Sequence, residues 1–95
     1  MDGYTDEICS IEPVDEKFKA FGWYTLRIDG SDPDKIVEAI RDAQANQGDK
    51  PAMIILDTVK GAGVKAVEDT KLNHHLNVSA DDADAYIAAL KAEME

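Results

Sequence analysis

A short apolar run that turns directly into a glycine-containing loop is the feature that most constrains the fold. The run Met53–Leu56 (MIIL) shows no polar alternation, which is typical of a strand buried on both faces within a parallel sheet. The loop Asp57–Gly63 that follows contains two glycines. Because ligands of open α/β sheets bind just beyond the carboxyl ends of such strands, we expect any binding site to lie in this loop.

An earlier segment, residues 23–29, predicts a second strand. Its residues alternate in polarity, with Tyr24, Leu26 and Ile28 on one side, as in a strand with one buried face. This pattern predicts a strand nearer to a sheet edge than the run Met53–Leu56.

A helix is expected between the two strands. Asp32 followed by Pro33 is typical of a helix start, and a capping box from Ser31 to Asp34 is an alternative register. The helical period then continues until Gly48. Strand, helix and strand in this order predict a βαβ unit with parallel strands.

Other segments give weaker signals. Val14, Phe18 and Phe21 share one face of a short predicted helix, and we expect Phe18, Phe21 and Trp23 to lie in the core. Ser79 is expected to cap a final helix with an apolar stripe. Residues 60–78 predict a long polar connection with a helical turn near 64–68, whereas residues 1–12 predict turns.

Together these segments predict an α/β fold in which residues 1–95 form a single domain. Two strands are too few to close a sheet whose edges are covered. We therefore expect a βαβ-containing fragment of a mostly parallel sheet flanked by helices.

Charge and composition exclude several classes of function. Twenty acidic side chains oppose ten basic ones, for a formal net charge of −10, which argues against nucleic acid as a partner. No apolar run is long enough to span a bilayer, and no signal peptide is recognised. The single cysteine, Cys9, fits a cytoplasmic protein with a buried or unreactive thiol.

Five short motifs stand out along the chain: Asp2–Glu7, Phe21–Trp23, Ile28–Gly30, Lys50–Pro51 and Asp57–Gly61. Their order and spacing resemble the transketolase family, most closely the separately encoded N-terminal subunit of split transketolases.

The resemblance implies the C-terminal part of a thiamine-diphosphate-binding domain. In the complete enzyme it implies transfer of a two-carbon ketol unit between sugar phosphates, with thiamine diphosphate and Mg²⁺ as cofactors, as in the pentose phosphate pathway. The family's metal-binding Gly-Asp-Gly motif and asparagine are absent from this chain, so we expect the isolated chain to be inactive. Its expected partners are the remainder of a transketolase or its C-terminal subunit, and a homo-oligomer is possible. A free-standing, non-catalytic protein-interaction module is the alternative.

The resemblance also carries roles onto single residues. Lys60, Gly61 and Gly63 match a loop that borders the cofactor, where this chain has Ala62 in place of a second lysine. His74 matches a histidine that contacts the diphosphate and the reacting centre, with His75 as the second choice. The glycines could instead serve only positive φ angles, and the histidines could be a surface pair rather than metal ligands.

Overall fold

The computed structural model describes residues 2–95 and divides them into two compact units. Residues 9–58 form one unit, and residues up to Ile8 together with 59–95 form the other. Within these residues, no helix is long and apolar enough to cross a membrane.

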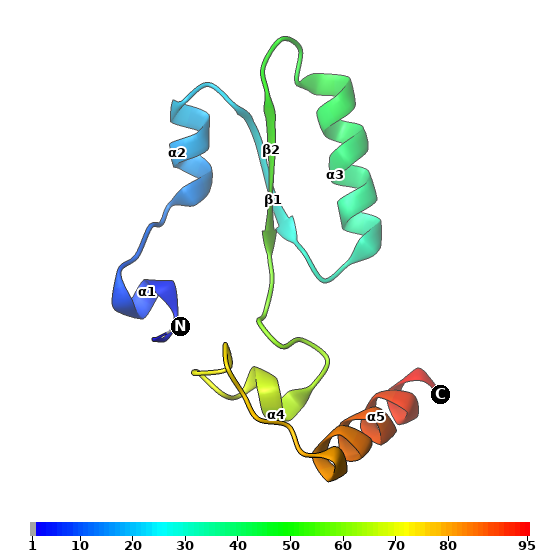
Figure 1. Cartoon of the computed structure of the whole chain (residues 1–95). Helices are drawn as coiled ribbons and strands as arrows, with labels where there is room; N and C mark the ends of the chain where they lie inside the picture. Colours follow the sequence, from blue (N-terminus) through cyan, green and yellow to red (C-terminus); the bar gives the residue numbers. More distant parts are fainter. Residues whose placement is uncertain (1) are drawn as a thin grey trace. The chain divides into compact units, whose positions relative to one another are not determined.

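The unit of residues 9–58 is built on two parallel strands (Figure 1), β1 (Tyr24–Asp29) and β2 (Ala52–Asp57). They pair in register from Tyr24 opposite Ala52 to Asp29 opposite Asp57. Helix α3 (Pro33–Asn46) connects them, so the predicted βαβ unit and the partial α/β fold are confirmed.

The start of α3 follows the first of the two predicted registers. The carboxylate of Asp32 accepts hydrogen bonds from the backbone N–H groups of Asp34 and Lys35, at 3.0 and 3.4 Å. Ser31 is engaged elsewhere, because its hydroxyl donates to Asp29 at 2.6 Å. The helix therefore begins at Pro33, whose missing N–H costs nothing at that position.

Two helices cover opposite faces of the strand pair. The side chains of Leu26 and Ile28 lie against α3, whereas Arg27 reaches Asp15 of α2 (Val14–Ala20). Figure 1 shows α2 and α3 on either side of the two strands. This alternation along β1 agrees with the polarity pattern of residues 23–29.

The core of this unit is small. Among residues 2–95, the buried hydrophobic residues are Ala39 and Ala43 of α3, each 5% exposed. The prediction that Met53–Leu56 is buried on both faces is wrong: the run is at most half-buried, and Leu56 is 44% exposed. The physical reason is that burial on both faces requires a wider sheet covered by helices, whereas in the described residues β2 pairs with β1 alone.

Phe18 and Trp23 pack edge to face, with ring centroids 5.4 Å apart. Phe21, in contrast, is 79% exposed at the C-terminal cap of α2, so its assignment to the core is wrong. The helix ends at Ala20, before the predicted apolar face completes its second turn. Cys9 is exposed, which excludes the buried thiol.

The second unit contains three helices: α1 (Thr5–Ile8), α4 (Lys65–Glu68) and α5 (Ala80–Met94). The predicted turn near 64–68 is confirmed by α4. Ser79 caps α5 as predicted, because its hydroxyl accepts from the N–H of Asp82 at 3.1 Å. Helix α1 was not predicted; it closes through the carbonyl of Tyr4, which accepts from Glu7 and Ile8.

Candidate functional site

The loop that follows β2 is shaped by two glycines. Backbone hydrogen bonds from Ala62 to Val59 and from Val64 to Gly61, both 3.1 Å, form two successive turns. Gly61 has φ +86° and Gly63 has φ +96°, which L-residues with a side chain rarely adopt. A Cβ at Gly61 would lie 2.6 Å from Cγ1 of Val67. Gly61 is therefore required by both conformation and space.

Two of the predicted site residues meet beside this loop. The ammonium nitrogen of Lys60 lies 3.0 Å from Nδ1 of His74, fourteen residues later. An ammonium group can only donate, so Nδ1 is the acceptor in this contact, which places the ring N–H at Nε2. The pair thus presents a cationic group next to an imidazole N–H, a suitable combination for an anion.

Asn73 holds the segment containing His74 against the loop. Its side-chain amide donates to the carbonyl of Lys60 at 3.1 Å and to the carbonyl of Val67 at 3.0 Å. The sequence reasoning did not assign Asn73 a role, since backbone acceptors leave no pattern in a sequence.

Glu68 occupies one of the loop's backbone donors. Its carboxylate accepts from the N–H of Gly63 at 2.9 Å. The loop therefore already holds an anionic group in this structure, as expected for an exposed N–H in a glycine turn.

The other lysines near the loop are paired with carboxylates. Lys65 contacts Asp69 and Lys71 contacts Glu7, each at 2.9 Å. The hydrogen bonds that the two ammonium groups donate to these carboxylates raise the pKa of both lysines. Lys60 contacts a ring nitrogen instead, so its positive charge is not compensated by that partner.

No metal centre is found within residues 2–95: no group of three or more His, Cys, Asp or Glu side chains could hold an ion there. His75 is exposed.

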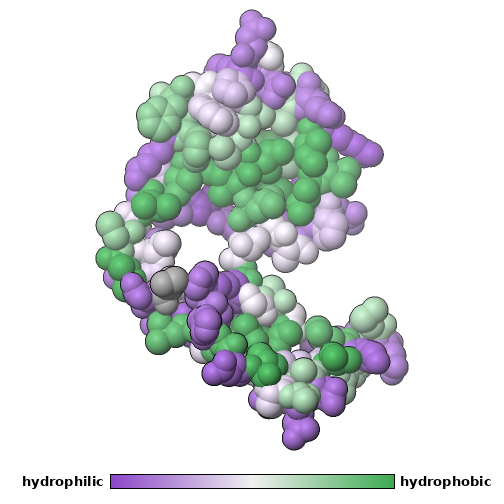
Figure 2. Space-filling model, in the orientation of Figure 1, coloured by the Kyte–Doolittle hydropathy of each residue, from purple (hydrophilic) through white to green (hydrophobic). Residues whose placement is uncertain are grey.

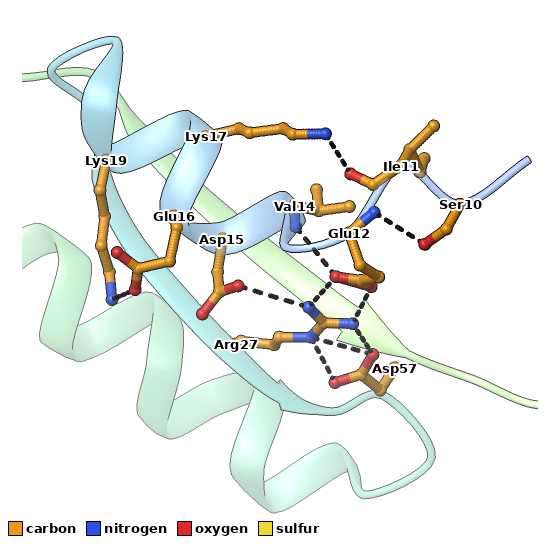
Figure 3. Close-up of polar contacts among 10 residues, drawn as sticks. All are labelled: Ser10, Ile11, Glu12, Val14, Asp15, Glu16, Lys17, Lys19, Arg27 and Asp57. Carbon is orange, nitrogen blue, oxygen red and sulfur yellow. Dashed lines mark hydrogen bonds and ion pairs between the residues drawn. The ribbon is translucent and has the colours of Figure 1, made fainter. Parts of the chain in front are cut away.

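A charged cluster at the carboxyl ends of the strands was also missed by sequence reasoning. Arg27 binds Asp57 with two nitrogens, at 2.9 Å each, and binds Glu12 at 2.7 and 2.9 Å (Figure 3). Asp15 lies 3.5 Å away. The hydrogen bond from Arg27 lowers the pKa of Glu12 to about 2 and also lowers the pKa of Asp57. The cluster joins the segment before α2 to the ends of both strands.

This cluster predicts acid sensitivity. The pKa of Glu12 falls from 4.5 to about 2 on folding, so its contribution is complete above pH 4.5 and is lost as pH falls towards about 2. We expect the urea midpoint of the wild-type chain to fall across that window, and the Glu12→Gln variant to lose part of this pH dependence. Glu16→Gln is the control, because it removes a carboxylate that pairs with Lys19 and not with Arg27. Equal pH slopes for wild type and Glu12→Gln would contradict the expectation.

An open hollow of about 310 Å³ lies between β1 and α3. Leu26, Ile28 and Ala39 supply apolar lining, and Lys35, Glu38 and Asp42 supply polar groups. None of the residues predicted for the cofactor site lines it. The candidate site is therefore the loop with its lysine–histidine pair rather than this hollow.

Comparison with known proteins defines the class to which the chain belongs. Residues 1–94 match the family model described as the thiamine diphosphate-binding domain of transketolase. The chain is a member of the transketolase family, which confirms the resemblance read from its motifs.

Two relatives make the relationship more specific. The chain is 41% identical over 93 residues to the 6-deoxy-6-sulfo-D-fructose transketolase subunit of a Clostridium species, covering 98% of this chain and 34% of that protein. It is 32% identical over 91 residues to an apulose-4-phosphate transketolase subunit of Actinobacillus succinogenes, covering 96% and 32%. The chain thus spans about a third of the length of these curated relatives.

Proposed function

We propose that this chain contributes the Lys60–Gly63 loop and His74 to the thiamine diphosphate site of an enzyme that transfers two-carbon ketol units between sugars. The observation that carries the proposal is the contact between Lys60 and His74 at 3.0 Å. It brings together two residues that the family resemblance assigns to one site.

The donors of the loop fit a diphosphate. Lys60 offers an ammonium group and His74 an Nε2–H, which suit phosphate oxygens. The N–H of Gly63 could join them once a ligand oxygen displaces the carboxylate of Glu68. Lys60, Gly61 and Gly63 would hold the diphosphate. A magnesium ion, if the complete enzyme uses one, would need ligands from outside this chain.

Thiamine diphosphate, when bound, supplies the carbanion chemistry of ketol transfer. The chain's own contribution is binding and proton placement. Lys60 keeps Nδ1 of His74 occupied as an acceptor, so the ring can offer its Nε2–H to an oxygen of the cofactor or the substrate. On this proposal His74 is both a cofactor-binding and a catalytic residue.

The relatives suggest a substrate class. Their names specify a sulfonated fructose and a phosphorylated apulose, both of which are sugars with an anionic group. We propose a sugar phosphate or sulfonate as substrate, and the pentose phosphate pathway as one setting among several.

The proposed partner of this chain is the remaining part of a transketolase, and the proposed location is the cytoplasm. On this proposal residues 1–95 fold within one domain.

A non-catalytic interaction module is the second candidate. The observation in its favour is the exposed hydrophobic surface of residues 9–58, which includes Val37, Ile40 and Leu56. Figure 2 shows hydrophobic residues gathered on one face of this unit. Such surfaces mark interaction sites. In a complete transketolase, however, other parts of the enzyme would cover the same surface.

Amide NMR of the chain distinguishes the two candidates. Thiamine diphosphate is expected to shift the signals of Gly61, Gly63 and His74 selectively, while unphosphorylated thiamine, the matched control, leaves them in place. We expect no ketol transfer by the chain alone, because a single isolated segment supplies neither metal ligands nor the rest of the site. Unchanged spectra would favour the interaction module. Ketol transfer by the chain alone would contradict the proposal that this chain supplies only part of the site.

A further inference from the structure

The side chain of Asn73 is placed where it can control the geometry of the Lys60–His74 pair. Its Nδ2 carries two hydrogens, and the two carbonyls it contacts belong to separate segments. One is Lys60 in the loop after β2, and the other is Val67 in α4. Asn73 is half-buried, so water replaces these bonds less readily than at a fully exposed position.

Both ends of the pair depend on this amide. The bond to the carbonyl of Lys60 fixes the main chain from which the lysine side chain starts. His74 follows Asn73 directly, so the same bond also fixes the main chain of the imidazole. A lysine side chain is long and flexible, and ordering it for a single contact is entropically costly. When the main chain is fixed at both residues, less conformational entropy is lost as Nζ of Lys60 and Nδ1 of His74 come into contact.

Val67, whose carbonyl accepts the second hydrogen bond of the Asn73 amide, also lies beside the turn at Gly61. Val67 is the residue that a Cβ at Gly61 would strike. The amide of Asn73 therefore connects the histidine, the lysine and the wall against which the glycine turn packs.

We propose that Asn73 is the positioning residue of the anion site: it aligns His74 with Lys60 through two backbone carbonyls and does not itself touch the ligand. This inference deepens the proposed function and rests on it for the nature of the ligand. The alignment itself exists without any ligand, so it is tested separately.

The first test uses the full chain without ligand. Wild type is expected to show a nuclear Overhauser contact between the Cε hydrogens of Lys60 and the ring of His74. Asn73→Leu, which keeps the volume and removes the donors, is expected to lose this contact while the signals of β1, β2 and α5 remain. Asn77→Leu is the matched control, because Asn77 lies in the same segment, is exposed, and should leave the contact unchanged. Retention of the contact in Asn73→Leu would overturn the proposal.

The second test measures binding of inorganic pyrophosphate by calorimetry. Asn73→Leu is expected to weaken pyrophosphate binding about tenfold, which corresponds to the loss of roughly one net hydrogen bond. Asn77→Leu is expected to change the affinity less than about twofold. If the lysine–histidine contact is lost in Asn73→Leu but wild type binds no pyrophosphate, the positioning role stands and the proposed function fails. If wild type and Asn73→Leu bind equally well, the proposed function stands and the positioning role fails.

A measurement on wild type alone covers the case in which Asn73→Leu does not fold. The two Nδ2 hydrogens of Asn73 are expected to exchange with solvent at least about tenfold more slowly than those of Asn77, because both are hydrogen-bonded. Equal exchange rates for the two side chains would overturn the proposal.

Discussion

Gly61→Ala is expected to unfold the loop that carries Lys60. Gly61 has φ +86°, and a left-handed conformation costs a residue with a side chain about 1–2 kcal/mol. The new Cβ would also lie 2.6 Å from Cγ1 and 3.2 Å from the carbonyl carbon of Val67, and overpacking of this kind costs roughly 1–3 kcal/mol. The sum is a large part of the stability of a small domain. In amide NMR spectra, the signals of residues 59–78 should collapse while those of β1 and β2 persist.

Gly63→Ala separates the two causes of this effect. Gly63 has a similar φ of +96°, but the nearest atom to its Cβ is Cδ2 of Leu90 at 3.7 Å, an ordinary contact. This variant should therefore retain dispersed loop signals and lose only the conformational part, about 1–2 kcal/mol. If Gly61→Ala and Gly63→Ala have equal effects, the packing against Val67 does not matter and the steric argument is wrong.

Replacing Lys60 by methionine is expected to weaken binding of thiamine diphosphate by roughly ten- to a hundredfold, the usual range for a hydrogen bond to a charged group. Lys60 differs from Lys65 and Lys71 in contacting a ring nitrogen rather than a carboxylate. Its charge is therefore available to an anion in a chain whose net charge is −10. Calorimetric titration with the cofactor, at one fixed salt concentration, measures the change.

Lys65→Met is the matched control for that experiment. It removes the same charge from the same unit, but Lys65 is already paired with Asp69 at 2.9 Å. We expect its effect on cofactor affinity to stay below about threefold, the share of general electrostatic attraction across solvent. Equal losses for Lys60→Met and Lys65→Met would mean that net charge alone governs binding and that Lys60 has no specific role.

Local chemistry made the helices and strands predictable. Asp32 and Ser79 cap α3 and α5 because the side-chain oxygen of each accepts from backbone N–H groups that lie within three residues. The run after Pro51 predicts β2 through its own composition, since two adjacent β-branched isoleucines within a short apolar segment favour a strand. Burial was not predictable in this way. Leu56 and Phe21 are exposed because burial depends on neighbours that a segment's own pattern does not describe.

The candidate site shows the same division between local and distant interactions. The glycine loop could be located from spacing, and His74 was assigned to it through the family resemblance. Arg27 could not be assigned, because its partners Glu12 and Asp57 lie 15 and 30 residues away. The role of Asn73 also escaped prediction, because its bonds go to backbone carbonyls that every residue possesses.

The bond between Glu68 and Gly63 has a consequence for selectivity. Any oxygen that takes the Gly63 N–H must first displace a carboxylate tethered five residues away. A tethered group acts as an internal competitor whose local concentration does not fall when the protein is diluted, so apparent affinity is reduced by the fraction of time the amide is occupied. A simple carboxylate gains little from this exchange, since it replaces a group of its own kind. On the proposed function, a diphosphate gains a further contact with Lys60, so we expect the loop to favour a diphosphate over a simple carboxylate.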